Sequence, residues 1–130
     1  MNKSEVYFCI VGDDFDPDIV TERIGIQPSR ILRKGSPLPR FSSWAFSSGK
    51  VTSEIVDVYE LSSRVIATLA PHAEAIRSVM EDNDLSAFLE VVLHISMDES
   101  LSTPAIGFDT SVVEFLAKIG ASIDIDTYRS

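Results

Sequence analysis

Phe15-Asp16-Pro17-Asp18-Ile19-Val20 recurs late in the chain as Phe108-Asp109-Thr110-Ser111-Val112-Val113. Each copy is followed by a basic residue, Ile and Gly, in the triplets Arg23-Ile24-Gly25 and Lys118-Ile119-Gly120, and the spacing to this ending differs by two residues. This repeat divides the chain into two similar halves, each expected to fold as strand, helix and strand.

Both copies carry the signals of a helix start. Asp16 and Asp109 are good N-caps, because a short carboxylate accepts hydrogen bonds from the free amides of the first turn. Pro17 fits the first helical position, where its missing N–H removes no hydrogen bond. Each copy also has the two residues of a hydrophobic staple, Phe15 with Val20 and Phe108 with Val113. Gly25 and Gly120 are expected to end the two helices in a left-handed conformation.

Size and composition favour a single domain over residues 1–130. The chain has 130 residues, of which 45% are hydrophobic, and a chain of this size buries roughly two-thirds of its unfolded surface. No apolar run approaches the roughly 20 residues of a membrane helix, and the run from Val6 to Val11 fits a strand better than a signal peptide. Cys9 is the only cysteine and permits no internal disulfide, so a cytoplasmic location fits best.

Charge is distributed unevenly along the chain. The net charge of −9 argues against binding to nucleic acid. The window 23–52 nevertheless carries +6 and no Asp or Glu, which leaves −15 on the remainder. Such a basic segment can receive an anion or an acidic partner, dock against the protein's own carboxylates, or form a solvated loop. Its basic residues are Arg23, Arg30, Arg33, Lys34, Arg40 and Lys50.

The order of expected elements predicts the fold class. Half one covers about 5–49, with strands near 5–12 and 43–48 around a helix at 17–24. A helical pair at about 54–82 is broken by Pro71. Half two covers about 86–128, where six apolar residues alternate from Ala87 to Met97 and a last strand ends the chain. We therefore predict an α+β fold, a ferredoxin-like two-layer sandwich of two βαβ halves in an antiparallel sheet, with the helical pair inserted between them.

Few residues offer chemistry. The acids at 14–18 resemble the opening of a calcium loop, but Ile19 and Gly25 stand where that loop needs Gly and Glu. Cys9 has no positioned His and is expected in the core. If the strands at 87–97 and 122–128 are near each other, one sheet face carries a candidate acid/base site beside Phe88, made of His94, Asp124, Asp126 and Tyr128.

The chain resembles a bacterial family, the domain of unknown function 4279 (DUF4279-like). The resemblance rests on Gly12 to Thr21, on the run from Gly25 to Arg30 with Lys34-Gly35, on Trp44 with Phe46-Ser47, and on Gly120 to Tyr128. It implies a small bacterial cytoplasmic domain and brings no established activity, cofactor or catalytic residue. It also places Arg30, Lys34 and Trp44 at the family's recognisable centre.

Two hypotheses follow. The first is a non-enzymatic binding module that holds an acidic ligand or partner through the segment 26–46 and resembles an immunity protein in role. Its contacts would be Arg30, Arg33, Lys34 and Arg40, with Trp44 either as a flat apolar wall or as core. The second is a small-molecule sensor or enzyme at the site of His94. Neither invokes a metal or cofactor, and a homodimer through a sheet edge is compatible with both.

Overall fold

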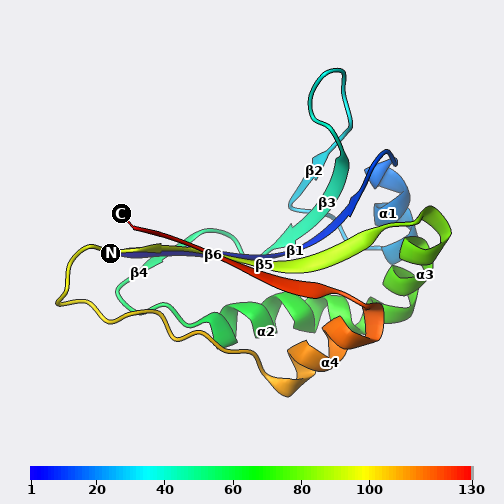
Figure 1. Cartoon of the computed structure of the whole chain (residues 1–130). Helices are drawn as coiled ribbons and strands as arrows, with labels where there is room; N and C mark the ends of the chain where they lie inside the picture. Colours follow the sequence, from blue (N-terminus) through cyan, green and yellow to red (C-terminus); the bar gives the residue numbers. More distant parts are fainter. Residues whose placement is uncertain (130) are drawn as a thin grey trace.

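A computed structural model describes residues 1–129 (Figure 1). Eleven elements follow one another within these residues: β1 (Asn2–Gly12), α1 (Pro17–Ile24), β2 (Arg30–Leu32), β3 (Ser42–Ser47), β4 (Val51–Ser53), α2 (Val58–Leu69), the 3-10 turn η1 (Ala70–His72), α3 (Ala73–Asn83), β5 (Ser86–Ile95), α4 (Thr110–Ile119) and β6 (Ser122–Arg129).

The strands form one mixed sheet. Within residues 1–129 the order is β2-β3-β1-β5-β6, and β4 pairs with the first residues of β1. Strand β1 is central and runs antiparallel to both β3 and β5, whereas β5 and β6 are parallel. The helices lie along one side of this sheet, and the β2–β3 hairpin rises from the opposite side (Figure 1). We call the side without helices the open face.

The α+β class and the helices between the halves agree with the sequence prediction, but the ferredoxin-like arrangement is not confirmed. The expected antiparallel sheet of two βαβ halves is wrong in two respects. Strands β1 and β3, which flank α1, are antiparallel neighbours, while β5 and β6, which flank α4, are parallel. The long connection from Gly25 to Phe41, which contains β2, allows the chain to reverse and return beside β1.

Strand β5 shows why the sheet has one buried face. Ala87, Leu89, Val91 and Leu93 are buried, as their alternation predicts, and they pack with Val6, Phe8 and Ile10 of β1 in the core. Burial of each such aliphatic side chain stabilises the fold by about 1.5–3 kcal/mol. The strand ends at Ile95, so the expected inclusion of Met97 is wrong, and Met97 is exposed.

The two middle helices cover this face. Helix α2 begins at Val58 and not near residue 54, because Asp57 caps it by accepting from the Glu60 amide. Pro71 interrupts the helical stretch as a 3-10 turn, and α3 then continues to Asn83, close to the expected end near residue 82. None of the helices in residues 1–129 combines the length and the apolar character needed to cross a membrane.

The two copies of the repeat differ in detail. Asp16 caps α1 with its side chain, which accepts from the Asp18 amide, and Pro17 is the first helical residue. Asp109 precedes α4 in an extended conformation but makes no such bond. Val113 is half-exposed, so the expected second staple is wrong. Both helices end at a left-handed glycine as predicted, at Gly25 and Gly120.

Candidate functional site

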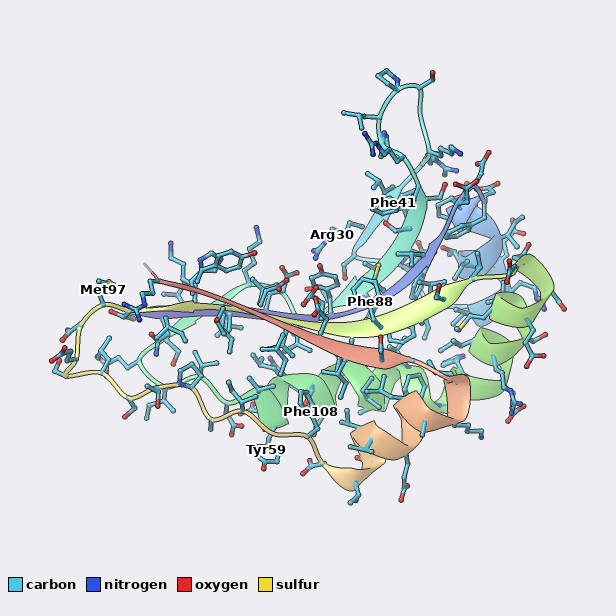
Figure 2. All side chains as sticks on the ribbon, viewed as in Figure 1. Arg30, Phe41, Tyr59, Phe88, Met97 and Phe108 are labelled. Carbon is cyan, nitrogen blue, oxygen red and sulfur yellow. The ribbon has the colours of Figure 1, made fainter. Side chains whose placement is uncertain are left out.

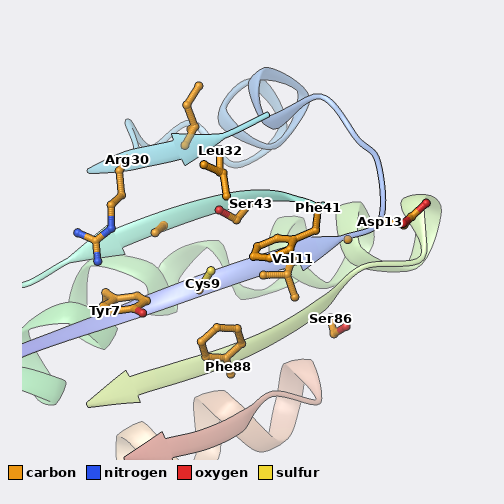
Figure 3. A pocket seen from close by; sticks show the side chains of 13 residues that line it. Tyr7, Cys9, Val11, Asp13, Arg30, Leu32, Phe41, Ser43, Ser86 and Phe88 are labelled. Carbon is orange, nitrogen blue, oxygen red and sulfur yellow. The ribbon is translucent and has the colours of Figure 1, made fainter. Parts of the chain in front are cut away.

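A cavity of about 710 Å³ lies on the open face (Figure 3). Alternation along β1 turns Tyr7, Cys9 and Val11 toward it, because Val6, Phe8 and Ile10 point into the core. Strand β5 adds Phe88 and the β2–β3 hairpin adds the remaining wall. This volume falls in the usual range for small-molecule sites. We call it the open-face cavity; its lining also includes Arg30, Leu32, Phe41, Ser43, Ala45 and Ser86.

Arg30 is the cation of this cavity. Its Nη1 donates to Oε2 of Glu5 at 2.8 Å, and its guanidinium carbon lies 4.5 Å from the centre of the Tyr7 ring. Burial alone would raise the pKa of Glu5, but hydrogen bonds from Arg30 and Ser47 outweigh it, so the pKa is lowered. The Glu5 side chain is 10% exposed and that of Arg30 48%. Arg30 is thus fixed in place while part of it still faces solvent.

Cys9 lines the cavity, which the sequence prediction of a core cysteine did not include. It is buried, and desolvation raises the pKa of its thiol to about 11. At neutral pH the side chain is therefore a neutral thiol. It contributes apolar surface to the cavity and has little nucleophilic character.

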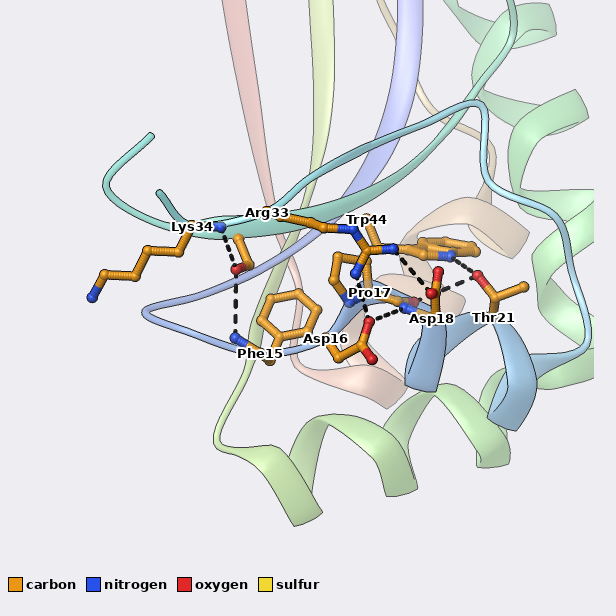
Figure 4. A network of polar contacts seen from close by, with 9 residues as sticks. Phe15, Asp16, Pro17, Asp18, Thr21, Arg33, Lys34 and Trp44 are labelled. Carbon is orange, nitrogen blue, oxygen red and sulfur yellow. Dashed lines mark hydrogen bonds and ion pairs between the residues drawn. The ribbon is translucent and has the colours of Figure 1, made fainter. Parts of the chain in front are cut away.

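The predicted basic contacts do not converge on the cavity. Arg33 pairs with Asp16 at 2.8 Å and with Asp18 at 2.9 Å (Figure 4). Lys34 lies 3.3 Å from Asp13. These ion pairs join the β2–β3 hairpin to the start of α1 and to the residues just before it, and Asp16 and Asp18 belong to the first copy of the repeat. Exposed pairs of this kind contribute little to stability. Of the alternatives given for the basic segment, docking against the protein's own carboxylates therefore applies to Arg33 and Lys34.

Trp44 and Arg40 lie elsewhere. Trp44 is fully buried on the helix side of β3, and its Nε1 donates to Oγ1 of Thr21 at 3.0 Å (Figure 4). It is core and forms no wall of the open-face cavity. Arg40 is exposed in the loop between β2 and β3. Of the five residues predicted for the first site, only Arg30 lines the cavity. Figure 2 shows Arg30, Phe41 and Phe88 on the open face.

A second feature of the open face is an acid cluster made of Glu90, Asp124 and Asp126. The parallel register of β5 and β6 places Glu90 beside Asp124 and Val92 beside Asp126. One oxygen from each carboxylate lies within 4.8 Å of the others. Glu90 is only 6% exposed, and its Oε2 has no hydrogen-bond partner. Burial, followed by the neighbouring Asp124 and Asp126, raises the pKa of Glu90 to about 7.

His94 contacts Tyr128, its partner in the register of β5 with β6, and not the acid cluster. The rings of His94 and Tyr128 are stacked with centroids 4.9 Å apart and an angle of 18° between their planes. Among residues 1–129 no hydrogen bond or ion pair joins His94 to Asp124 or Asp126. The four residues of the second predicted site thus share one face, as expected, but form two groups.

Sequence reasoning missed Glu90 as a member of this site. The neighbours of Glu90 across the sheet depend on the register of β5 with β6, which a single sequence does not give. Tyr7 was also missed, although the alternation in 5–12 was a usable signal, since Tyr7, Cys9 and Val11 share a face. Phe41 lies outside any regular element, and no pattern marked it.

Comparison with known protein families assigns the chain to a family. The family model described as "Domain of unknown function (DUF4279)" matches residues 2–130, nearly the whole chain. The protein therefore belongs to the DUF4279 family. No curated protein and no solved structure matched it.

Proposed function

We propose that this protein is a non-enzymatic binding module, and that the open-face cavity holds a ligand with an apolar body and an anionic end. The observation that carries the proposal is a mostly apolar cavity with one fixed guanidinium, that of Arg30, at its wall. Clefts lined mainly by apolar side chains, with few polar groups to orient the ligand, are typical of binding sites.

Arg30 suits the anionic end of such a ligand. A guanidinium has five N–H donors, more than the Glu5 carboxylate can accept, and its fork matches carboxylate and phosphate groups. Glu5 and the Tyr7 ring hold it in one position, so little conformational freedom is lost on binding. Of the predicted basic contacts, the proposal retains only Arg30 as a ligand contact. Arg33 and Lys34 instead form the ion pairs that join the β2–β3 hairpin to the acids near the start of α1.

A thermal-shift series tests the ligand class. Alkyl and aryl carboxylates would be compared with their uncharged amides, which keep the apolar body and remove the charge. A carboxylate at about 100 times its dissociation constant should stabilise the fold by roughly 2.7 kcal/mol, which raises the melting temperature by at least about 5 °C. Equal responses to acid and amide would remove Arg30 from the proposal, and no response to either would reject the cavity as a site for this class.

A matched pair of variants in one loop locates the site. Phe41 and Leu38 are both exposed apolar residues of the β2–β3 loop, but only Phe41 lines the cavity. Phe41→Ala should weaken binding of the carboxylate, whereas Leu38→Ala should leave it unchanged. Equal affinities for both variants would place the ligand elsewhere.

A protein partner is a second candidate for the occupant, as in the immunity-like hypothesis. The observation that favours it is the −15 charge outside the window 23–52, which suits a basic partner surface. A sensor or enzyme at His94, Asp124 and Asp126 has weaker support, because His94 stacks on Tyr128 and not on an acid.

A further inference from the structure

The acid cluster places three carboxylates of two neighbouring strands on the open face. Glu90 comes from β5, and Asp124 and Asp126 come from β6. Their nearest oxygens lie within 4.8 Å of one another. Like charges at this separation repel, so the group is unfavourable as three bare anions. Its arrangement needs a positive charge or a proton at its centre.

Glu90 is the member of the cluster for which a neutralising partner matters most. Glu90 is only 6% exposed, and its Oε2 atom is buried without a hydrogen-bond partner. Buried polar atoms in native proteins are nearly always satisfied by protein, water or an ion. Among residues 1–129 no Lys, Arg or His forms an ion pair with any of the three acids.

A second group of acids, near the start of α1, provides a comparison. Asp13, Asp16 and Asp18 also lie close together in sequence, but Arg33 and Lys34 neutralise them. These aspartates are exposed and are fully explained by capping and ion pairing. The acid cluster on β5 and β6 differs because it has a buried member and no cation of its own.

We propose that Glu90, Asp124 and Asp126 bind a divalent metal ion on the open face. All donors are carboxylate oxygens, which select hard cations such as Ca²⁺, Mg²⁺ and Mn²⁺ over the softer metals that prefer thiolate or imidazole. Glu90 supplies the buried ligand, and the aspartates supply ligands from the solvent side. Three protein ligands leave positions for water, so the site is of the partly hydrated kind that Mg²⁺ favours.

The site is independent of the open-face cavity, because none of its three residues lines that cavity. It does lie next to it: Glu90 is paired in register with Tyr7 of β1, which lines the cavity wall. A metal ion at the cluster would hold the edge strand β6 to its neighbour β5. The proposal therefore stands or falls separately from the proposed carboxylate ligand.

Metal-dependent thermal unfolding and calorimetry test the proposal. The protein is first stripped with a chelator, and CaCl₂, MgCl₂ or MnCl₂ is then added singly to roughly 10 mM, above the weakest range of protein calcium modules. At least one ion should raise the melting temperature, and a calorimetric titration should give about one ion per chain. No shift with any of the three ions would overturn the proposal.

Glu90→Gln keeps the shape of the side chain and removes its charge. The variant should melt higher than the stripped wild-type protein, because repulsion within the cluster falls, and should bind the ion at least about 10-fold more weakly. Asp124→Asn, at an exposed position, is a second variant with the same expected loss of binding. The control is Glu114→Gln, an exposed acid on α4 with the same change in charge.

The control distinguishes a site from general attraction to an acidic protein. Glu114→Gln should bind the ion as the wild-type protein does. If Glu90→Gln and Asp124→Asn also bind it unchanged, the ion lies elsewhere and the proposal is wrong. If the cluster instead receives a lysine or an organic amine, metal ions will not stabilise the protein, and that result equally rejects the metal site.

Discussion

Arg30 and Glu5 form an ion pair, with 2.8 Å between Nη1 and Oε2, that joins β2 to β1 across the intervening β3. Ser47 of β3 donates to the same carboxylate oxygen, so Glu5 connects three strands on the open face. Strand β2 has only three residues, and this contact anchors it.

Replacing Arg30 should destabilise the fold measurably. Arg30→Gln removes the cation and leaves the largely buried Glu5 carboxylate with only its Ser47 partner. Because Arg30 is itself half-exposed, we expect a loss of about 1–3 kcal/mol in the free energy of unfolding. Urea denaturation followed by circular dichroism measures it.

The control for this prediction is Glu5→Gln in a double-mutant cycle with Arg30→Gln. The two changes should be non-additive, because each removes the same interaction. Additive losses would show that the pair contributes nothing as a pair and that Arg30 acts through its packing on Tyr7 alone.

The same pair predicts a pH dependence. The pKa of Glu5 is lowered from 4.5 in the folded protein, since the contacts from Arg30 and Ser47 outweigh burial. A lowered folded pKa means that the unfolded state binds more protons, so the stabilisation is complete well above pH 4.5 and is lost as the pH falls through the folded pKa. The difference in unfolding free energy between wild type and Glu5→Gln should be constant near neutral pH and shrink in acid. A difference that grows in acid has the wrong sign and would contradict the prediction.

The indole of Trp44 gives a third prediction. Its Nε1 is bound to Oγ1 of Thr21 at 3.0 Å, and the ring is fully buried. Thr21→Val keeps the shape of residue 21 but leaves the indole N–H without a partner, which costs about 1–3 kcal/mol. Thr21→Ser retains the hydroxyl and should lose less. If the two variants are equally stable in urea denaturation, the hydrogen bond is not what the side chain of Thr21 contributes.

Local signals in the sequence predicted the elements whose causes are local. Helix α1 has the predicted bounds because a proline, a capping acid and a terminal glycine mark them. Strand β5 has the predicted buried face, because strict alternation of apolar residues fits a sheet covered on one side. The break at Pro71 likewise follows from a missing amide.

Features that depend on pairing could not be read from one sequence. The short strands β2 and β4 have only three residues each, and no pattern of that length is distinctive. The direction of β3 beside β1 depends on how the connection between Gly25 and Phe41 folds back. The acid cluster depends on the register of β5 with β6, so Glu90 joined Asp124 and Asp126 only once the strands were paired.

The two copies of the repeat provide the final prediction, because the aspartates at equivalent positions, Asp16 and Asp109, make different contacts. Asp16 caps α1 and binds Arg33, whereas the Oδ2 of Asp109 accepts a 2.7 Å hydrogen bond from Oγ of Ser63 on α2 and caps nothing. Asp109→Ala should therefore be coupled to Ser63→Ala in a double-mutant cycle, with an interaction of about 0.5–1.5 kcal/mol. Asp16→Ala should lower the melting temperature more than Asp109→Ala, even in an Arg33→Gln background that removes the ion pair. If the two aspartate variants lower the melting temperature equally and Asp109 shows no coupling to Ser63, both aspartates act as helix caps. The two copies of the repeat would then share a structural role as well as a sequence.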